Sequence, residues 1–511
     1  MTNTNELVKG IIEQILPICK SWIRPNQLGL DQFVDPIDNN EISAHYGATH
    51  AAAAFILWGK QCHDRQLYNT GVQLVRSIVD RWEESVKLPS FHFDFNNFAL
   101  SLIVDEVEDP ILAETIKHII CKTADSNHQT INWLPMRWAV NAKRKEWTGS
   151  IVYDKVIQQC KHQIISAINA DGGIEDRLPH GISYNLQYNV ATVAELQYLR
   201  VHGENINLAK ELGFLLKVVA PDGDINYLGR GLNQIFAWGL WVYLLSSSGQ
   251  KEELIRALSY IGLYLPKMLH SQSMMLNEWD GHEKYLWWDY HYTSVYTAHC
   301  LLWLILAFID ANKAPIIPVY PELNSTGVHI CESENAFVCW FDGRSEYLAE
   351  QGPVIEAIWT RKNGMLSKGA FGPWKGCFGN KYLLADNVIK NFCGVLGIKI
   401  TNKWIQNKYL SKLLKINRAI PSLTYAPVFC PIKVQIKTHQ VHIIWTNSTM
   451  VDAIFNFPIA GTIKGADFTL QIDGKTIPLY EMGTIRNQYS WYTLFQSKIV
   501  KGKEFALIIA C

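Results

Sequence analysis

The chain has 511 residues, enough for about two or three domains with sizeable cores. Hydrophobic residues make up 48% of it and charged residues 18%, a balance that excludes disordered and collagen-like proteins. Lys and Arg together number 47, as do Asp and Glu, so the formal net charge is zero. Because nucleic acids and anionic membranes attract a basic excess, we expect neither as the main partner.

Aromatic residues are abundant, with 18 Trp, 22 Tyr and 20 Phe, which suits both a large core and stacking on sugar rings. The N-terminal segment lacks the basic stretch and apolar run of a secretory signal, and the 11 Cys are scattered without a CxxC motif. We therefore expect a reduced, cytoplasmic protein, although a secreted or periplasmic protein whose signal was removed would look the same. The longest apolar run, Cys300 to Ile309, is about half of a membrane span. The oligomeric state stays open.

Residues 1–314 show helical periodicity. Apolar residues recur at helical spacing, which predicts about eleven to thirteen helices between residues 3 and 311. Two of them, Ile235–Leu245 and Thr297–Ile309, are apolar nearly all round, so other elements must cover them on every side. An inner ring of helices inside an outer ring would cover them. We predict an (α/α) helical toroid.

A proline-rich linker, residues 315–321, follows the helical half. Beyond it the period of the apolar residues becomes two, as in Lys433–Trp445 and Phe468–Tyr480. The second of these segments carries an Asp-Gly pair typical of a hairpin turn. We predict an antiparallel β-sandwich over residues 322–511, and hence a multidomain protein of the α+β class.

Four segments of the helical half carry more polar and aromatic residues than helix packing needs: Thr130–Trp138, Asp171–Asn189, Asp222–Gln234 and Trp287–Tyr296. In the second segment, Ser183 is placed to cap a helix that carries Tyr184 and Tyr188 on one face, with His180 just before it. A phenol and an imidazole at the start of a helix can transfer protons. The alternative, in which both tyrosines bury their rings and satisfy their hydroxyls locally, stays open.

The third segment places Arg230 between two glycines before an apolar helix, where it can face a carboxylate or tie the loop to a carbonyl group. In the first segment, Asn132 offers an amide beside the flat ring of Trp133. Other polar and aromatic residues could line the same cleft, namely His92, Asp94, Asn96, Asn97, Trp287, Trp288, His291 and Tyr292. No cluster has convincing metal-ligand spacing, so no metal is expected.

An asparagine before a tryptophan, an Asp-Gly with His and Tyr downstream, and a Gly-Arg-Gly, in a helical half followed by a sandwich, resemble the toroid-plus-sandwich polysaccharide lyases. These include the chondroitin AC and hyaluronate lyases and, more loosely, heparinase II/III. The resemblance implies β-elimination on an acidic polysaccharide or oligosaccharide without a cofactor. It implies the catalytic residues Asn132, His180, Tyr188 and Arg230. It adds substrate contacts from Trp133, Tyr184, Asn233, Trp287, Trp288, His291 and Tyr292.

In such a lyase, Asn132 and Arg230 would neutralise the uronate carboxylate, and Tyr188 would take the C5 proton with help from His180. Tyr184 competes with Tyr188 for the role of base. A glycoside hydrolase on the same toroid would instead use two carboxylates, from among Glu175, Asp176, Asp222, Asp224 and Asp289. A carbohydrate-binding protein without catalysis is the third possibility. The sequence leaves open the polysaccharide, endo or exo action, and whether the protein degrades or helps to assemble a polymer.

Overall fold

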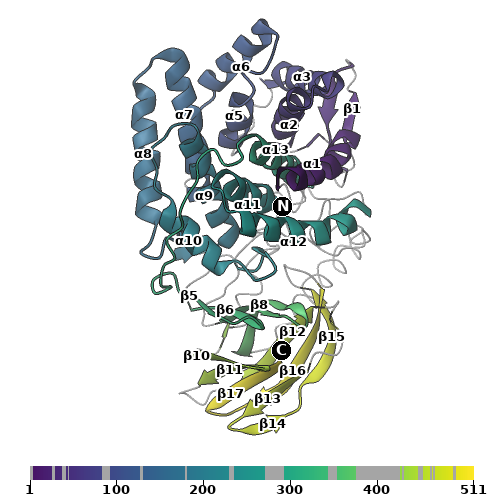
Figure 1. The fold of residues 1–511 in the computed structure, drawn as a ribbon, viewed down its shortest axis with the longest axis vertical. Coiled ribbons are helices and arrows are strands. Elements are labelled where there is room, and N and C mark those ends of the chain that lie inside the picture. The colour runs from purple at the N-terminus through teal and green to yellow at the C-terminus, as the bar shows by residue number, and fades with distance from the viewer. Residues whose placement is uncertain are drawn as a thin grey trace, which may run out of the picture.

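The computed structural model describes residues 4–25, 29–36, 42–43, 45–82, 92–126, 130–178, 181–183, 185–228, 235–270, 293–342, 354–375, 426–427, 431–446, 453–460, 463, 467–486 and 491–511. Helices make up the first part of the chain, and antiparallel strands make up the last part (Figure 1). The predicted fold class is confirmed, with a helical toroid followed by two antiparallel sheets.

Six of the described helices form a closed inner ring. Each contacts the next along the chain, and the last, α13, returns to contact the first, α2. Helix α11 is buried along its whole length, and α13 along nearly all of it, as expected for helices that are apolar all round. The inner helices are α2 (Gly47–Gln61), α5 (Phe93–Ser101), α7 (Leu134–Thr148), α9 (Leu186–Val201), α11 (Phe236–Ser247) and α13 (Thr293–Ile309).

Six further helices of the described residues form the outer layer, and each packs against the inner ring. Helix α3 is typical, because it buries Leu67, Leu74 and Val75 against the inner ring and exposes Arg76. The outer helices are α1 (Thr4–Ser21), α3 (Arg65–Asp80), α6 (Pro110–Lys122), α8 (Val152–Ala167), α10 (Ala209–Val218) and α12 (Lys251–His270). The described helices therefore make the two concentric layers that the periodicity predicts.

The first turns of the inner helices meet at one end of the ring. Inner and outer helices alternate along the chain, so the inner helices all run in the same direction. The ring of Tyr46, just before α2, stacks on Phe95 in α5 at 4.5 Å between centroids. His299 in α13 stacks on Phe236 in α11 at 4.7 Å. We call this end, with the residues just before each inner helix, the mouth.

Two short antiparallel ribbons lie in connections that lead into the mouth, and the periodicity did not predict them. Strand β1 (Ile23–Pro25) pairs with β2 (Asp31–Phe33), and β3 (Asp176–Leu178) pairs with β4 (Gly181–Ser183). Every strand pairing in the described part of the chain is antiparallel.

The C-terminal strands form two sheets. One has the order β10-β11-β17-β13-β14, and the other has the order β15-β16-β12-β8-β7-β6-β5, with β9 paired to β8. The predicted turn between β13 and β14 is confirmed, since Asp473 and Gly474 have φ of 46° and 77°, the left-handed region that such turns require. The strands are β5 (Val328–Glu332), β6 (Ala336–Phe341), β7 (Val354–Thr360), β8 (Gly364–Lys375), β9 (Ala426–Pro427), β10 (Ile432–Lys437), β11 (Gln440–Thr446), β12 (Ala453–Ala460), β13 (Phe468–Ile472), β14 (Lys475–Ile477), β15 (Tyr480–Arg486), β16 (Trp491–Val500) and β17 (Glu504–Ala510).

The segment between α13 and β5 carries the chain from the far end of the ring to the mouth end. Arg200, in the last turn of α9, donates to the carbonyl of Ala314 at 2.6 Å. The chain then follows α10, where Lys217 donates to the carbonyl of Pro321 at 2.7 Å. Next, Asp171, in the connection into α9, accepts from three consecutive amides of residues 324–326. The sandwich therefore docks at the mouth end of the toroid (Figure 1).

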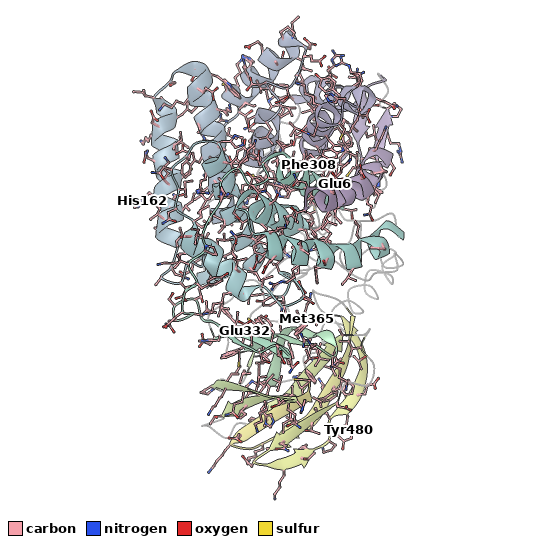
Figure 2. All side chains as sticks on the ribbon, viewed as in Figure 1. Glu6, His162, Phe308, Glu332, Met365 and Tyr480 are labelled. Atoms are coloured by element: carbon pink, nitrogen blue, oxygen red, sulfur yellow. The ribbon has the colours of Figure 1, made fainter. Side chains whose placement is uncertain are left out.

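Strand β6 has two apolar faces that serve two cores. Phe337 and Cys339 pack in the core of the helical half, whereas Ala336 and Val338 pack in the core between the sheets. Met365, in β8, lies on the side toward the helices, and the exposed Tyr480 lies on the far side (Figure 2). None of the helices described here is both long and apolar enough to cross a membrane.

Candidate functional site at the mouth of the helical ring

The mouth gathers aromatic and imidazole side chains from five of the six inner helices or the residues that precede them. His92 stacks on Trp133 at 5.2 Å between centroids, and Phe95 meets the same Trp133 edge-on at 5.0 Å. The rings of His50 and His299 lie 5.0 Å apart. We call this set the mouth cluster: Tyr46, His50, His92, Phe95, Trp133, Phe236 and His299.

The helix ends give the mouth a positive electrostatic character. Helices α2, α5, α7 and α11 all begin without a hydrogen bond from a capping side chain. Capping does not separate the two layers, because Asn185 caps the inner helix α9, Asp64 and Asp109 cap the outer helices α3 and α6, and the outer helices α8 and α10 begin without a capping side chain. An uncapped helix start carries partial positive charge on its first amides, so four such ends at one mouth favour an anionic guest.

Asn132 is the predicted site residue whose environment the structure shows most fully. It lies in a short 3-10 helix, Ile131–Trp133, directly before α7, and it is 3% exposed. Its amide oxygen has no hydrogen-bond partner among the described residues. A buried polar atom without a partner costs free energy, so it is typical of a site that a ligand or ordered water completes. Trp133, beside it, belongs to the mouth cluster.

Tyr188 lies in the first turn of α9, the next inner helix, which contacts the 3-10 helix that carries Asn132. Its backbone amide donates to the side chain of Asn185 at 3.2 Å, so Asn185 is the N-cap of α9. The ring of Tyr188 is partly buried and meets Phe236 edge-on at 6.5 Å. The prediction that Ser183 caps this helix is wrong, because Ser183 pairs with Asp176 in the β3–β4 ribbon.

The other predicted site residues lie outside the described residues. These are His180, Tyr184, Arg230, Asn233, Trp287, Trp288, His291 and Tyr292. The convergence of Asn132, His180, Tyr188 and Arg230 on one point therefore stays a prediction. The structure places two of the four, Asn132 and Tyr188, on neighbouring elements at the mouth.

Of the acids that a hydrolase would use, Asp222 and Asp224 lie together on the connection between α10 and α11. Burial and the neighbouring Asp224 raise the pKa of Asp222 above its usual range, although Lys368 opposes the shift. Asp224 is fully buried and ion-paired with Lys368 of β8. Glu175 contacts Asn169, while the side chain of Asp176 and the whole of Asp289 lie outside the described part. Among the acids that the structure describes, Asp222 and Asp224 lie close enough to interact, and the amide of Asp224 donates to the carboxylate of Asp222 at 3.1 Å.

Asp94, at the start of α5, has a structural partner. Burial raises its pKa to about 6, and Arg137 of α7, whose Nη2 lies 2.9 Å from its carboxylate, opposes that rise. Its other oxygen accepts from the amide of Ser126 at 3.4 Å. Asp94 thus ties α5 to α7 and to the connection that precedes α7.

The sequence reasoning missed the pair of buried histidines in the mouth cluster. His50 is fully buried, and its Nδ1 lies 3.0 Å from the carbonyl oxygen of Tyr46. Burial lowers the pKa of His50 to about 3 and holds the pKa of His299 well below its usual range, so both rings are neutral. The signal in the sequence was a histidine inside each of two apolar helices, α2 and α13. No cluster of three or more His, Cys, Asp or Glu side chains that could hold a metal ion occurs in the described part of the chain.

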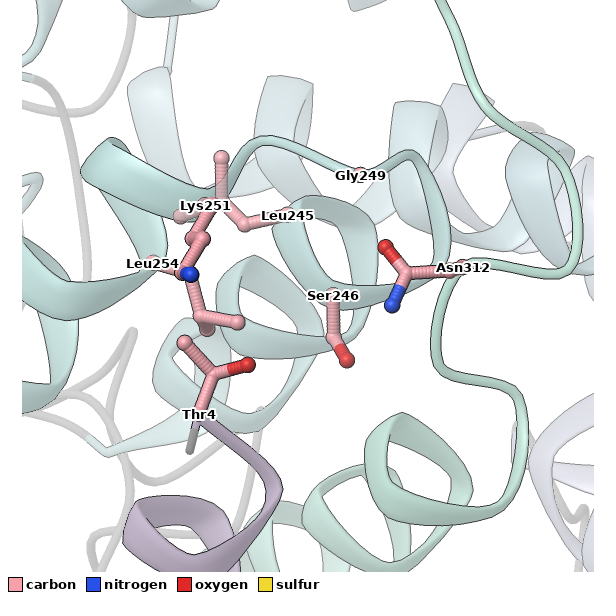
Figure 3. A pocket seen from close by; sticks show the side chains of 7 residues that line it. All are labelled: Thr4, Leu245, Ser246, Gly249, Lys251, Leu254 and Asn312. Atoms are coloured by element: carbon pink, nitrogen blue, oxygen red, sulfur yellow. The ribbon is translucent and has the colours of Figure 1, made fainter. Parts of the chain in front are cut away.

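A small pocket of about 180 Å³ lies at the opposite end of the ring, between the end of α11 and the start of α12 (Figure 3). Leu245, Lys251 and Asn312 are among the residues that line it. The hydroxyl of Ser246 in its wall already donates to the carbonyl of Ala307 at 2.8 Å. None of the predicted site residues lines this pocket.

Comparison with known proteins gives weak likenesses only. No family model and no curated protein matches the chain. Among solved structures, the GH76A α-1,6-mannanase from Salegentibacter sp. HEL1_6 is 12% identical, with a TM-score of 0.42 over 60% of this chain and 99% of that one. An unsaturated glucuronyl hydrolase from Bacillus sp. GL1 is also 12% identical, with a TM-score of 0.42 over 61% of this chain and 99% of that one. At such values they assign no activity to this chain.

Proposed function

We propose that the protein is an enzyme that acts on an acidic saccharide bound at the mouth of the helical ring. The observation that carries this proposal is the meeting, at one end of the ring, of four uncapped helix starts with the mouth cluster. Aromatic rings stack on the apolar faces of sugars, and the helix ends attract a carboxylate. The unpaired amide oxygen of Asn132 adds an acceptor for a sugar hydroxyl.

The reaction that these residues support best is β-elimination from a uronate. The side-chain NH2 of Asn132, with Arg230 as the sequence predicts, would donate to the carboxylate and stabilise the negative charge that develops on it. Tyr188 would take the proton from C5, and a double bond would form between C4 and C5. The C4–O4 bond would break with its electron pair on O4, which would then receive a proton from Tyr188 or His180. The step needs no oxidant or reductant.

Hydrolysis is the second candidate, and one observation favours it. Asp222 and Asp224 form a close pair in which the pKa of Asp222 is raised by burial and by its neighbour, as in many acid–base pairs. The mannanase and the glucuronyl hydrolase named above are hydrolases by name. The two candidates differ in whether Tyr188 or the aspartate pair carries the reaction.

A screen of purified protein against uronate-containing and neutral polysaccharides tests the proposal. Elimination would produce an unsaturated uronate, which absorbs in the ultraviolet, whereas hydrolysis would release reducing ends without that absorbance. We expect new absorbance with at least one uronate polymer and none with neutral polymers. Reducing ends from a neutral polymer alone would support the hydrolase. Binding of a polymer without any product would overturn the enzyme proposal.

A further inference from the structure

The sandwich contributes a largely buried lysine to the rim of the mouth. Lys368, on the face of β8 that is turned toward the helical half, forms an ion pair with Asp224, on the connection between α10 and α11. Its Nζ also lies 3.5 Å from the hydroxyl of Tyr260 in α12. The side chain of Lys368 is 14% exposed and that of Asp224 is not exposed at all. Such a desolvated pair fixes the relative position of the elements that carry it.

Hydrogen bonds connect Asp224 to the start of α9. Its carboxylate accepts from the backbone amide of Asn226 at 2.6 Å. The side-chain oxygen of Asn226 accepts from Nε2 of Gln187 at 2.8 Å, and both side chains are buried. Gln187 directly precedes Tyr188 in the first turn of α9.

A second contact joins the same two segments through the backbone. The amide of Leu186, the first residue of α9, donates to the carbonyl of Leu228 at 3.1 Å. The connection that Lys368 holds is therefore bonded to α9 at two points, Asn226 and Leu228. A shift of this connection would move the turn that carries Tyr188.

We infer that Lys368 is a positioning residue, through which the docked sandwich holds the first turn of α9, and with it Tyr188, in place for the reaction. This inference rests on the proposed function, because it assigns Tyr188 a part in the chemistry. The sandwich would then contribute to the function of the site. Lys368 acts through Asp224, Asn226 and Gln187 and is not itself assigned a contact with the substrate.

Hydrogen–deuterium exchange on the full chain tests the inference without any substrate. In Lys368→Met we expect the amides of Leu186, Tyr188 and Asn189 to exchange at least about tenfold faster, while α3, on the other side of the ring, keeps its rate. Lys368→Arg should restore slow exchange because it keeps the positive charge. The matched control is Lys362→Met, since Lys362 lies in the same hairpin and pairs with Asp467 on the surface of the sandwich.

A double variant covers the case in which Lys368→Met fails to fold because it leaves the Asp224 carboxylate buried alone. Lys368→Met with Asp224→Asn removes both charges, and we expect it to fold and to show the same fast exchange at the start of α9. Unchanged exchange at α9 in folded variants, or equal acceleration in α3, would overturn the inference.

Kinetics with a substrate found in the screen give the second readout. If Lys368 positions Tyr188, turnover in Lys368→Met should fall at least about tenfold with little change in KM, and Lys368→Arg should recover most of it. A rise in KM with unchanged turnover would overturn the positioning role. If exchange responds as expected but the unmodified protein cleaves no saccharide, the proposed function fails, whereas the coupling between sandwich and α9 stands.

Discussion

At the scale of single residues, Tyr188 and Asn132 carry most of the proposed chemistry. Asn132 is held before α7 with a buried, unpaired amide oxygen, and Tyr188 stands in the first turn of the adjoining α9. A phenol in that position can reach a sugar only if its ring points into the mouth. Its edge-on contact with Phe236 of α11 places it on that side of α9.

Replacement of Tyr188 by Phe removes one hydroxyl group and keeps the ring. If Tyr188 transfers the proton, we expect turnover to fall by about two to four orders of magnitude, with little change in substrate binding or in melting temperature. Steady-state kinetics with the substrate from the screen would measure this. Tyr153→Phe, in the outer helix α8, is the matched control and should keep full activity. An equally active Tyr188→Phe variant would remove Tyr188 from the mechanism.

Glu195, inside α9, has a carboxyl group that no described residue hydrogen-bonds. Burial, with a smaller contribution from Asp94, raises its pKa well above the ordinary value of 4.5. Because its pKa is raised in the folded protein, the carboxyl group of Glu195 is held in its neutral form there. Its contribution to the free energy of unfolding is therefore fully present below pH 4.5 and is lost as the pH rises through the folded pKa.

We therefore expect Glu195→Gln, which stays neutral, to flatten the pH dependence of stability. The free energy of unfolding of the variant, minus that of the unmodified protein, should increase as the pH rises from about 5 to 8. The increase should be at most about 1.4 kcal/mol per pH unit. Denaturant unfolding at several pH values would measure it. Glu146→Gln, at an exposed ion pair of α7, should show no such gain. Parallel curves for the two proteins would contradict a raised pKa at Glu195.

At the scale of elements, the close approach of inner helices depends on small residues. A Cβ atom added to Gly239 of α11 would lie 2.4 Å from the carbonyl oxygen of Cys300 in α13, so Gly239→Ala should lower the free energy of unfolding by about 1–3 kcal/mol. Gly262 of the outer helix α12 has no atom within 4 Å of such a Cβ, so Gly262→Ala should be neutral or stabilise by about 0.5–1 kcal/mol. Thermal unfolding of both variants checks the contrast, and equal effects would refute this packing.

Periodicity predicted the helices and strands because each pattern is complete within its own segment. Helices α11 and α13 could be recognised as inner helices from their apolar composition alone. The cap of α9 was assigned wrongly, because Ser183 and Asn185 are both good capping residues and only strand pairing takes Ser183 away. The mouth cluster could not be predicted, since His50 and His299 meet only when the ring closes.

At the scale of the whole molecule, the position of the sandwich depends on the segment that leads to it. The change of period marks where the sandwich begins but does not show on which end of the toroid it docks. Asp171 anchors this segment to the toroid, because one of its carboxylate oxygens accepts from the amides of Asn324, Ser325 and Thr326 at 2.6 to 3.0 Å. Although burial alone would raise it, these hydrogen bonds hold the pKa of Asp171 below its usual value.

Asp171→Asn should loosen the sandwich from the toroid and lower the free energy of unfolding by about 2 kcal/mol at neutral pH. Because the pKa of Asp171 is lowered in the folded protein, this difference should shrink as the pH falls below 3.8, its ordinary value. Limited proteolysis of the segment between α13 and β5, with calorimetry, would measure both effects. Asp467→Asn, on the sandwich surface, is the control. Unchanged protection of that segment would count against this anchor.

The central claim is that the mouth of the ring is the active site for an acidic saccharide. Mass spectrometry of the products formed from uronate oligosaccharides in heavy-oxygen water tests this claim most directly. We predict two fragments whose masses add up to that of the intact substrate, with no heavy oxygen incorporated, because elimination adds no water. One heavy oxygen in each pair of products would show hydrolysis and would contradict the elimination step, and intact oligosaccharides throughout would contradict the claim itself.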